Sequence, residues 1–249
     1  MDLKKIFFVE FFGTLFLTIS ILGTHYCYTS HSSNYEYGAV SRDGADYWIF
    51  FLALGFCGLF TMQAYGSNLV VTMNPATMLV YFFEKKINLK DWLISFIFQV
   101  AAAFCGGFLI WLQNTDQGSV LDNVTFWASM NSSSVWDGIF ENLLGSFVWM
   151  TLLLILADVA FVPDLPKSLY SFLAGLSWAM CIHSFGRLTY TIYNPAIDVG
   201  LRIWSLTQSE EHAFSKADGY FWIPLVIPFA GVTLGFLFYK FVVVKFVKA

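Results

Sequence analysis

Six apolar segments, each about twenty residues long, constrain what this chain can fold into. A helix that crosses a bilayer needs roughly 20 mainly apolar residues, because each residue rises ~1.5 Å and the hydrocarbon layer is ~30 Å thick. The segments that meet this requirement are 6–28, 47–66, 92–113, 138–162, 168–186 and 220–246. They predict a membrane protein with six spanning helices and a surface that faces lipid.

The composition supports this prediction and excludes several other classes of protein. Charged residues make up only 12% of the chain, whereas they make up about a quarter of a typical soluble domain. The basic residues form no run longer than two, so nucleic acid is not an expected partner. The four cysteines form no Cys-x-x-Cys pair and have no His at ligand spacing, so neither a disulfide framework nor a metal site is expected.

The distribution of basic residues predicts how the chain is oriented in the membrane. Short cytoplasmic loops carry an excess of Lys and Arg. With a cytoplasmic N-terminus, nine of the 13 basic residues fall on the inner side, and the loop 114–137 contains none. We therefore expect both termini in the cytosol and the loop 114–137 outside. The expected location is the plasma membrane, with an organelle membrane as the alternative.

Two shorter apolar stretches, 75–83 and 195–204, open with the same tripeptide, Asn-Pro-Ala. About ten residues make ~15 Å of helix, which is half a bilayer. Pro suits the first helical position, and Asn before it is a good N-cap. The tripeptides therefore predict the starts of two half-helices inside the membrane. Their residues are Asn74, Pro75, Ala76, Asn194, Pro195 and Ala196.

The two tripeptides occupy matching places in an internal duplication. Each follows an acid within an apolar span, Glu10 by 64 residues and Glu141 by 53 residues. Because each repeat contains three spans, an odd number, the second repeat enters the membrane from the opposite side. We predict a single transmembrane domain over 1–249, with inverted repeats 1–113 and 138–249 joined by the extracellular loop 114–137.

Two half-helices that meet N-terminus to N-terminus create a polar point at mid-membrane. Their unpaired N–H groups and positive dipole ends repel cations there. The amides of Asn74 and Asn194 would donate hydrogen bonds to a neutral molecule, whereas hydronium or Na⁺ would meet both desolvation and a positive field. This arrangement predicts passive conduction of small uncharged solutes, exclusion of protons and ions, and no cofactor.

These features resemble the major intrinsic protein family of aquaporins and aquaglyceroporins along essentially the whole chain. The paired Asn-Pro-Ala tripeptides are the family hallmark, and segment 10–14 resembles its opening motif. Positions typical of the glycerol-conducting branch are Asp198, Arg202, Pro224 and Leu225. The resemblance implies an all-α fold, a right-handed bundle of six transmembrane helices with two re-entrant half-helices. It also implies a homotetramer that passes glycerol-like polyols, with urea, ammonia or water as further candidates.

The residues expected at the narrowest point depart from the family pattern. The family carries Arg directly after the second Asn-Pro-Ala, where this chain has Ile197. Counting without gaps places the other three constriction residues at Leu54, Ile182 and Thr191. Such a selectivity filter is apolar with one hydroxyl, so it should disfavour fast water flux and tolerate molecules that have a carbon face.

Two nearby residues are candidates to take the place of residues in this filter. A shift of one position would bring His183 into the place of Ile182, although a helix histidine is more often a packing residue than a proton switch. Arg187 precedes Asn194 by seven residues and is a candidate for the missing charge, although loop arginines usually face water.

Glu10 and Glu141 are acids inside apolar helices, a place where ionisable groups are often functional. A structural role is favoured here, because unpaired backbone is costly in lipid and each half-helix is preceded by non-helical backbone. In the family, the resembling acids accept hydrogen bonds from that backbone. We therefore expect Glu10 and Glu141 to be structural buried acids.

Two other classes of protein compete with a channel. Ser177 and His183 suggest a serine hydrolase, but six residues along a helix correspond to a rotation of ~600°, so the side chains point in different directions. No catalytic residues are therefore predicted. The second alternative is a channel fold whose pore has degenerated and which keeps a structural or assembly role in a membrane complex. Ile197 would be tolerated in such a protein.

Overall fold

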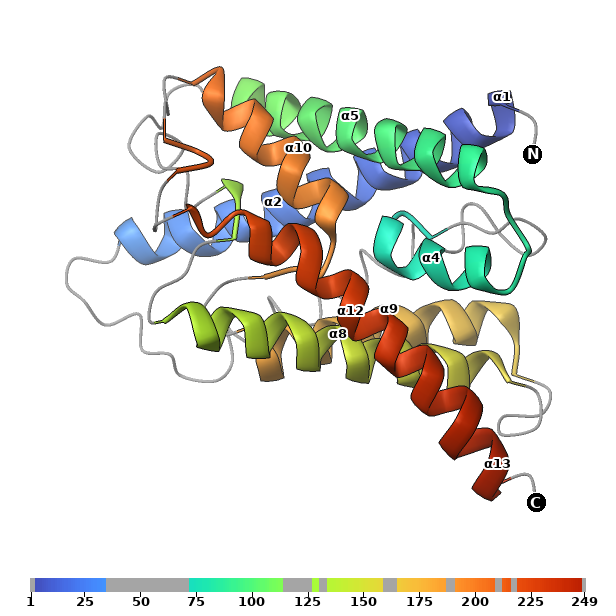
Figure 1. The fold of residues 1–249 in the computed structure, drawn as a ribbon. Helices are drawn as coiled ribbons and strands as arrows, with labels where there is room; N and C mark the ends of the chain where they lie inside the picture. The colour runs from blue at the N-terminus through green and yellow to red at the C-terminus, as the bar shows by residue number, and fades with distance from the viewer. Residues whose placement is uncertain are drawn as a thin grey trace.

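A computed structural model of the chain describes residues 3–34, 72–113, 127–129, 134–158, 165–186, 191–208, 212–215 and 219–247. Every regular element within these residues is a helix, and the helices pack as one bundle (Figure 1). In chain order they are α1 (Leu3–Ile6), η1 (Phe7–Phe11), α2 (Phe12–Asn34), α4 (Pro75–Phe83), α5 (Leu89–Gln113), α8 (Val135–Ala157), α9 (Lys167–Phe185), α10 (Pro195–Leu206), α12 (Trp222–Phe238), η2 (Tyr239–Val243) and α13 (Val244–Val247).

Four stretches of helix in the described residues are long and apolar enough to cross a membrane. They are the continuous α1–η1–α2 rod, α5, α8 and the continuous α12–η2–α13 rod. The fifth predicted span corresponds to α9, whose apolar part, Leu169–Phe185, is shorter. The second predicted span, 47–66, lies outside the described residues.

The ends of α8 differ from the predicted span 138–162. The helix begins earlier, at Val135, because the Ser134 side chain caps it by accepting a hydrogen bond from the backbone of Asp137. It also ends earlier, at Ala157, because Asp158 adopts an extended conformation with φ −90° and ψ 112°. Apolar composition alone predicts neither the start nor the end of this helix, because each is determined by a single polar residue.

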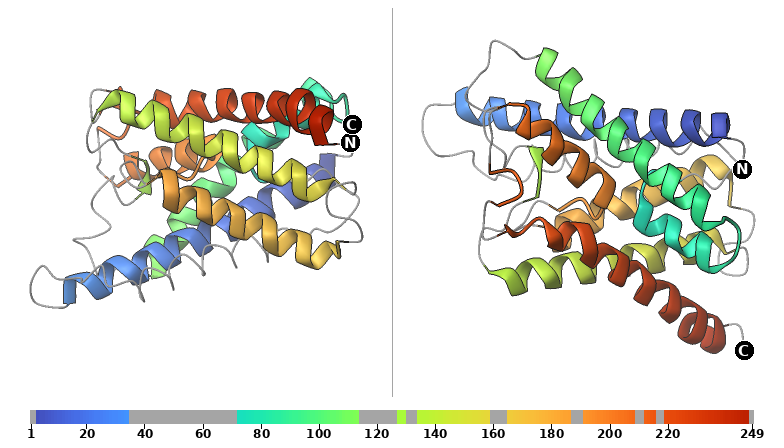
Figure 2. Two further views of the ribbon diagram at one scale, coloured as in Figure 1. Left: turned by 90° about the horizontal axis from the view of Figure 1, so that it is seen from below. Right: turned by 45° about the horizontal axis from the view of Figure 1, so that its top comes forward.

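Close helix packing places the two half-helices against the long helices. The half-helix α10 packs on α5, as the right-hand view of Figure 2 shows, and the half-helix α4 packs on α5 and α12. The long helices α8 and α12 also pack on each other. A Cβ atom at Gly200 would lie 2.5 Å from the carbonyl oxygen of Val100, and one at Gly231 would lie 2.5 Å from that of Leu143. Side chains larger than hydrogen therefore cannot fit at these two crossings, where small residues let the backbones approach.

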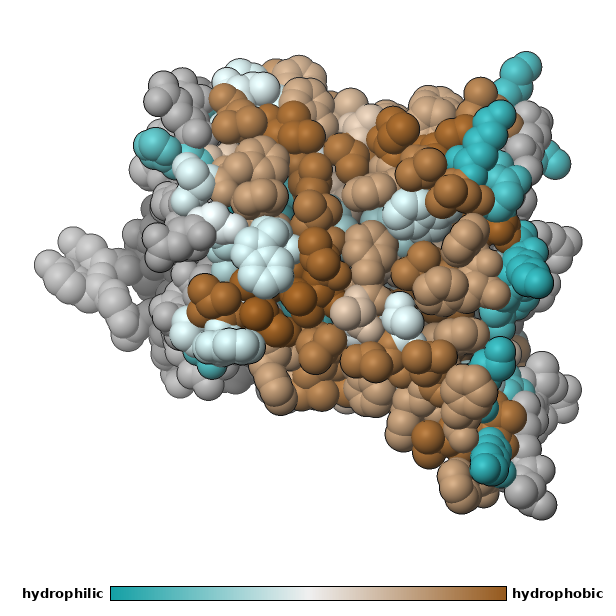
Figure 3. Space-filling model, in the orientation of Figure 1, coloured by the Kyte–Doolittle hydropathy of each residue, from teal (hydrophilic) through white to brown (hydrophobic). Residues whose placement is uncertain are grey.

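The surface of the bundle is apolar over its middle. On the face shown in Figure 3, hydrophobic residues cover the centre and hydrophilic residues gather along the edge where α1 and α13 lie. Large exposed apolar side chains include Ile97, Phe140 and Phe241. A soluble monomer rarely exposes a continuous apolar surface of this kind. The chain is an integral membrane protein. Its first helix, α1, and its last helix, α13, lie on the same side of the bundle (Figure 1).

Candidate functional site

Both half-helices begin at the predicted residues. Pro75 and Pro195 each occupy the first turn, and the preceding Asn is extended, with φ −152° at Asn74 and φ −126° at Asn194. The Asn74 Oδ1 atom accepts a hydrogen bond from the backbone N–H of Ala76 at 2.9 Å. Asn194 likewise accepts from Ala196 at 3.2 Å. Each Asn is therefore the N-cap of its own helix, as the tripeptide predicts.

The same two Asn residues join the half-helices to each other. The Nδ2 atom of Asn74 donates to the carbonyl of Tyr193 at 2.8 Å, and that of Asn194 donates to the carbonyl of Met73 at 2.7 Å. We call this reciprocal arrangement the asparagine junction. In Figure 1, α4 approaches it from the side on which the termini lie, and α10 approaches from the opposite side. An amide nitrogen carries two hydrogens, so each Asn keeps one N–H beyond its crosswise bond.

The residue before each cap has a left-handed backbone conformation, with φ 49° at Met73 and φ 54° at Tyr193. Neither is Gly or Asn, the residues that favour this conformation, so each costs roughly 1–2 kcal/mol. The conformation turns the carbonyl group toward the opposite Asn. Burial helps to hold it: Tyr193 is enclosed, and its hydroxyl donates to the carbonyl of Cys181 in α9 at 3.0 Å. Nothing in the sequence signals this strain.

An acid holds the backbone that leads into the first half-helix. Glu10 is 1% exposed, and its carboxyl group accepts hydrogen bonds from the N–H groups of Thr72 at 3.4 Å and Met73 at 3.1 Å. The side chain of Gln99 in α5 donates to the same group at 2.7 Å. Glu10 lies in η1, a π-helical turn of a kind often found at functional positions. Gln99 was not among the predicted residues, although a lone amide in an apolar span is a signal of this type.

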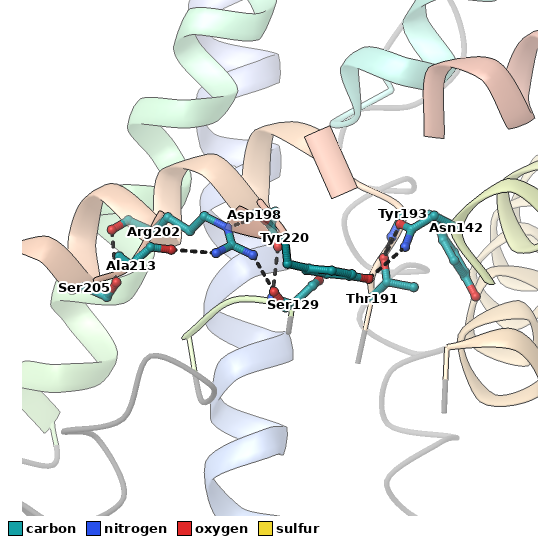
Figure 4. Close-up of polar contacts among 9 residues, drawn as sticks. All are labelled: Ser129, Asn142, Thr191, Tyr193, Asp198, Arg202, Ser205, Ala213 and Tyr220. Carbon is teal, nitrogen blue, oxygen red and sulfur yellow. Dashed lines mark hydrogen bonds and ion pairs between the residues drawn. The ribbon is translucent and has the colours of Figure 1, made fainter. Parts of the chain in front are cut away.

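The corresponding region of the second predicted repeat differs. Asn142 is completely buried, and its Oδ1 atom accepts a hydrogen bond from the hydroxyl of Thr191 at 2.7 Å (Figure 4). Its Nδ2 atom donates to the carbonyl of Gly138 at 2.9 Å and lies 3.4 Å from the Tyr220 hydroxyl. Glu141 is only half-buried, so the expectation that it is buried like Glu10 is wrong. Successive helix residues point ~100° apart, and Asn142 occupies the inward direction.

The residues predicted for the selectivity filter lie in different surroundings. Thr191 and Ile197 are both 0% exposed, and Ile197 belongs to the main apolar core. Ile182 and His183 are half-buried near the end of α9. Leu54 and Arg187 lie outside the described residues. Within the described ranges, no three His, Cys, Asp or Glu side chains gather closely enough to hold a metal ion.

Comparisons with known proteins agree with this geometry. The model of the family described as "Major intrinsic protein" matches residues 1–239. Aquaglyceroporin-2 of Trypanosoma brucei brucei is 32% identical over 107 residues, which cover 42% of this chain and 34% of the relative. Aquaglyceroporin-3 of the same organism is 34% identical over 109 residues, which cover 43% of this chain and 36% of the relative. The chain thus aligns with about a third of the length of these two relatives.

Plasmodium falciparum provides both a sequence relative and a solved structure. The aquaglyceroporin of isolate 3D7 is 28% identical over 162 residues, which cover 64% of this chain and 62% of the relative. The X-ray structure of the aquaglyceroporin from Plasmodium falciparum superimposes with a TM-score of 0.85 at 24% identity and covers 99% of each chain. The chain therefore has the same fold as that protein.

Proposed function

The chain belongs to the major intrinsic protein family, and on this premise we propose that it is a passive channel for small uncharged solutes. Glycerol-like polyols are the proposed permeants, with urea, ammonia and water as further candidates. Protons and other ions are excluded. The observation that carries the proposal is the asparagine junction, in which two half-helix N-termini meet and each Asn retains an N–H group.

The chemistry of the junction suits a neutral solute. A hydroxyl or carbonyl oxygen that has lost its water shell can accept hydrogen bonds from the remaining N–H groups of Asn74 and Asn194. The positive ends of α4 and α10 face the same point and disfavour any cation there. Ion exclusion then depends on the half-helices, because Ile197 stands where the family has Arg.

The constriction, assembly and orientation are further parts of the proposal. Leu54, Ile182, Thr191 and Ile197 form the proposed constriction, with His183 and Arg187 as substitutes. The complete burial of Thr191 and Ile197 favours positions in the wall rather than projection into the passage. The protein is proposed to be a homotetramer in the plasma membrane. Both of its termini are proposed to lie in the cytosol.

The test is solute flux in proteoliposomes, followed by stopped-flow light scattering with glycerol. Asn194→Asp keeps the capping oxygen but replaces the donating amide with a carboxyl group. We expect it to lower glycerol flux at least about tenfold, because the crosswise donor and the positive field are both lost. Asn88→Asp is the matched control, since exposed Asn88 caps α5 far from the junction through a 2.8 Å bond from Asp91.

Two results would overturn the proposal. If the native chain passes neither glycerol nor any other small neutral solute, the structural or assembly role becomes the better account. If the native channel carries a proton current across a pH gradient, the half-helices do not exclude ions as proposed.

A further inference from the structure

One basic side chain of the outer half-helix is completely enclosed. Arg202 lies in α10, two turns after the asparagine junction, and is 0% exposed. A buried guanidinium group must be paired, because an uncompensated charge in the interior is very costly. Its Nε atom donates to the Oδ1 atom of Asp198 at 2.6 Å, one turn earlier on the same helix. The Asp198 side chain is itself only 1% exposed.

The other nitrogens of Arg202 reach two segments that are remote in sequence. Nη1 donates to the carbonyl of Ala213 at 2.6 Å, and Nη2 donates to the carbonyl of Ser129. Asp198 completes the arrangement, since its Oδ2 atom accepts from the N–H of Ser129 at 2.9 Å. We call these four residues, which Figure 4 shows together, the arginine clamp. It fastens segments 127–129 and 212–215 to α10.

The clamp acts on the turn of helix that carries the proposed constriction. Asp198 directly follows Ile197, the residue that stands in place of the family Arg. The backbone N–H of Ile197 lies 3.4 Å from the capping Oδ1 atom of Asn194. A displacement of Asp198 would therefore move Ile197 and the cap together. On its other side, α10 is held against α5 at Gly200.

The composition of the clamp favours a geometric role over a purely stabilising one. A buried ion pair is weak evidence for stability, because apolar residues of similar volume are often as stable or more so. The pair instead fixes geometry, because the planar guanidinium group donates hydrogen bonds to three separate acceptors at fixed angles. A lysine ammonium on a flexible chain does not reproduce these angles. All three of these contacts are internal, and none of the Arg202 surface is exposed.

We propose that Arg202 is a positioning residue for solute selection, and this inference rests on the proposed channel function. Through Asp198 it fixes the first turn of α10 against segments 127–129 and 212–215, and so sets the width of the passage beside Ile197. A rigid apolar constriction discriminates between solutes by size. Loosening the clamp should therefore weaken discrimination before it abolishes flux.

The test compares permeability to glycerol with permeability to a five-carbon polyol in proteoliposomes. We expect Arg202→Lys and Asp198→Asn each to lower the glycerol-to-pentitol ratio at least about threefold. The double variant should lower it no further, because both changes release the same clamp. Ser205→Ala is the matched control. It removes a buried hydroxyl that donates to the backbone carbonyl of Arg202 at 3.0 Å but leaves the clamp intact, so the ratio should not change.

A variant that fails to fold does not end the test. The pair Asp198→Leu with Arg202→Met removes both charges while filling the same space, a replacement that buried ion pairs often tolerate. It should fold and show the same loss of size discrimination. If any folded clamp variant reduces all fluxes in equal proportion with an unchanged ratio, Arg202 is only structural and the inference is overturned. A native chain without flux overturns the channel function and this inference with it.

Discussion

The two backbone segments that lead into the asparagine junction, one before Asn74 and one before Asn194, have the same conformation but are supported by different side chains. In both repeats an Asn caps the half-helix, and the residue before it is left-handed, with φ 49° and 54°. Behind the first approach stands Glu10, which accepts bonds from two backbone N–H groups. The corresponding buried side chain of the second repeat is Asn142, which accepts from the Thr191 hydroxyl instead. The two backbones therefore match, whereas the side chains that support them differ.

The largest expected effect separates these two supports. Glu10→Leu leaves the N–H groups of Thr72 and Met73 and the amide of Gln99 without their acceptor. We expect it to reduce the free energy of unfolding by at least about 3 kcal/mol, since each buried unpaired donor costs roughly 1–3 kcal/mol. Asn142→Leu leaves one donor, the Thr191 hydroxyl, without its acceptor and should cost about 1–3 kcal/mol. Denaturant unfolding of the purified protein in detergent measures both losses, and equal losses would show that the two supports are equivalent after all.

The two caps should respond alike, because they make the same two kinds of hydrogen bond. Asn74→Ala and Asn194→Ala each remove a cap, worth roughly 0.5–2 kcal/mol, and one crosswise bond, worth about 1 kcal/mol. We expect each change to lower the free energy of unfolding by about 2 kcal/mol, measured in the same way. A difference between them larger than about 1 kcal/mol would mean that the junction is asymmetric in energy despite its symmetric contacts.

The sequence predicted the fold where local chemistry dominates. Asn followed by Pro determines a helix start almost regardless of its surroundings, so the starts at Pro75 and Pro195 agree with the structure to the residue. The crosswise bonds join residues 119 and 121 positions apart, and no local pattern reports such contacts. The family resemblance marked Asp198 and Arg202, but not that they hold the backbones of remote segments.

The alignment of the repeats explains the error at Glu141. Matching acid to acid assumed that symmetry extends to side chains. The second repeat instead presents its neighbour, Asn142, to the interior, and neighbouring helix residues cannot share one direction. Burial of a polar residue is decided by which helix packs on it, and that information is tertiary. Aligning the two predicted repeats therefore predicts the position of a supporting residue to within one residue, but it does not predict which side chain stands there.

The smallest expected effect comes from the far ends of the half-helices, where even the backbones differ. After α4, Lys85 is left-handed with φ 58°, and its N–H lies 2.9 Å from the carbonyl of Phe82. The next N–H, of Lys86, lies 2.9 Å from the carbonyl of Tyr81, which completes the motif that normally places Gly at position 85. The end of α10 has no such turn: Thr207 is helical with φ −74°, and its hydroxyl donates to the Trp204 carbonyl at 2.6 Å.

Glycine should therefore act with opposite sign at these two ends. Lys85→Gly relieves the left-handed strain of an exposed residue and should raise the free energy of unfolding by about 0.5–1 kcal/mol, net of the entropy that Gly adds to the unfolded chain. Thr207→Gly relieves nothing, adds the same entropy and removes a hydrogen bond, so it should lower stability by about 0.5–1.5 kcal/mol. Lys85→Ala is the control, because it removes the lysine side chain but keeps a Cβ in the left-handed region. If Lys85→Ala raised the free energy of unfolding as much as Lys85→Gly, the gain would come from loss of the lysine side chain. The backbone conformation at Lys85 would then not explain the difference between the two half-helix ends.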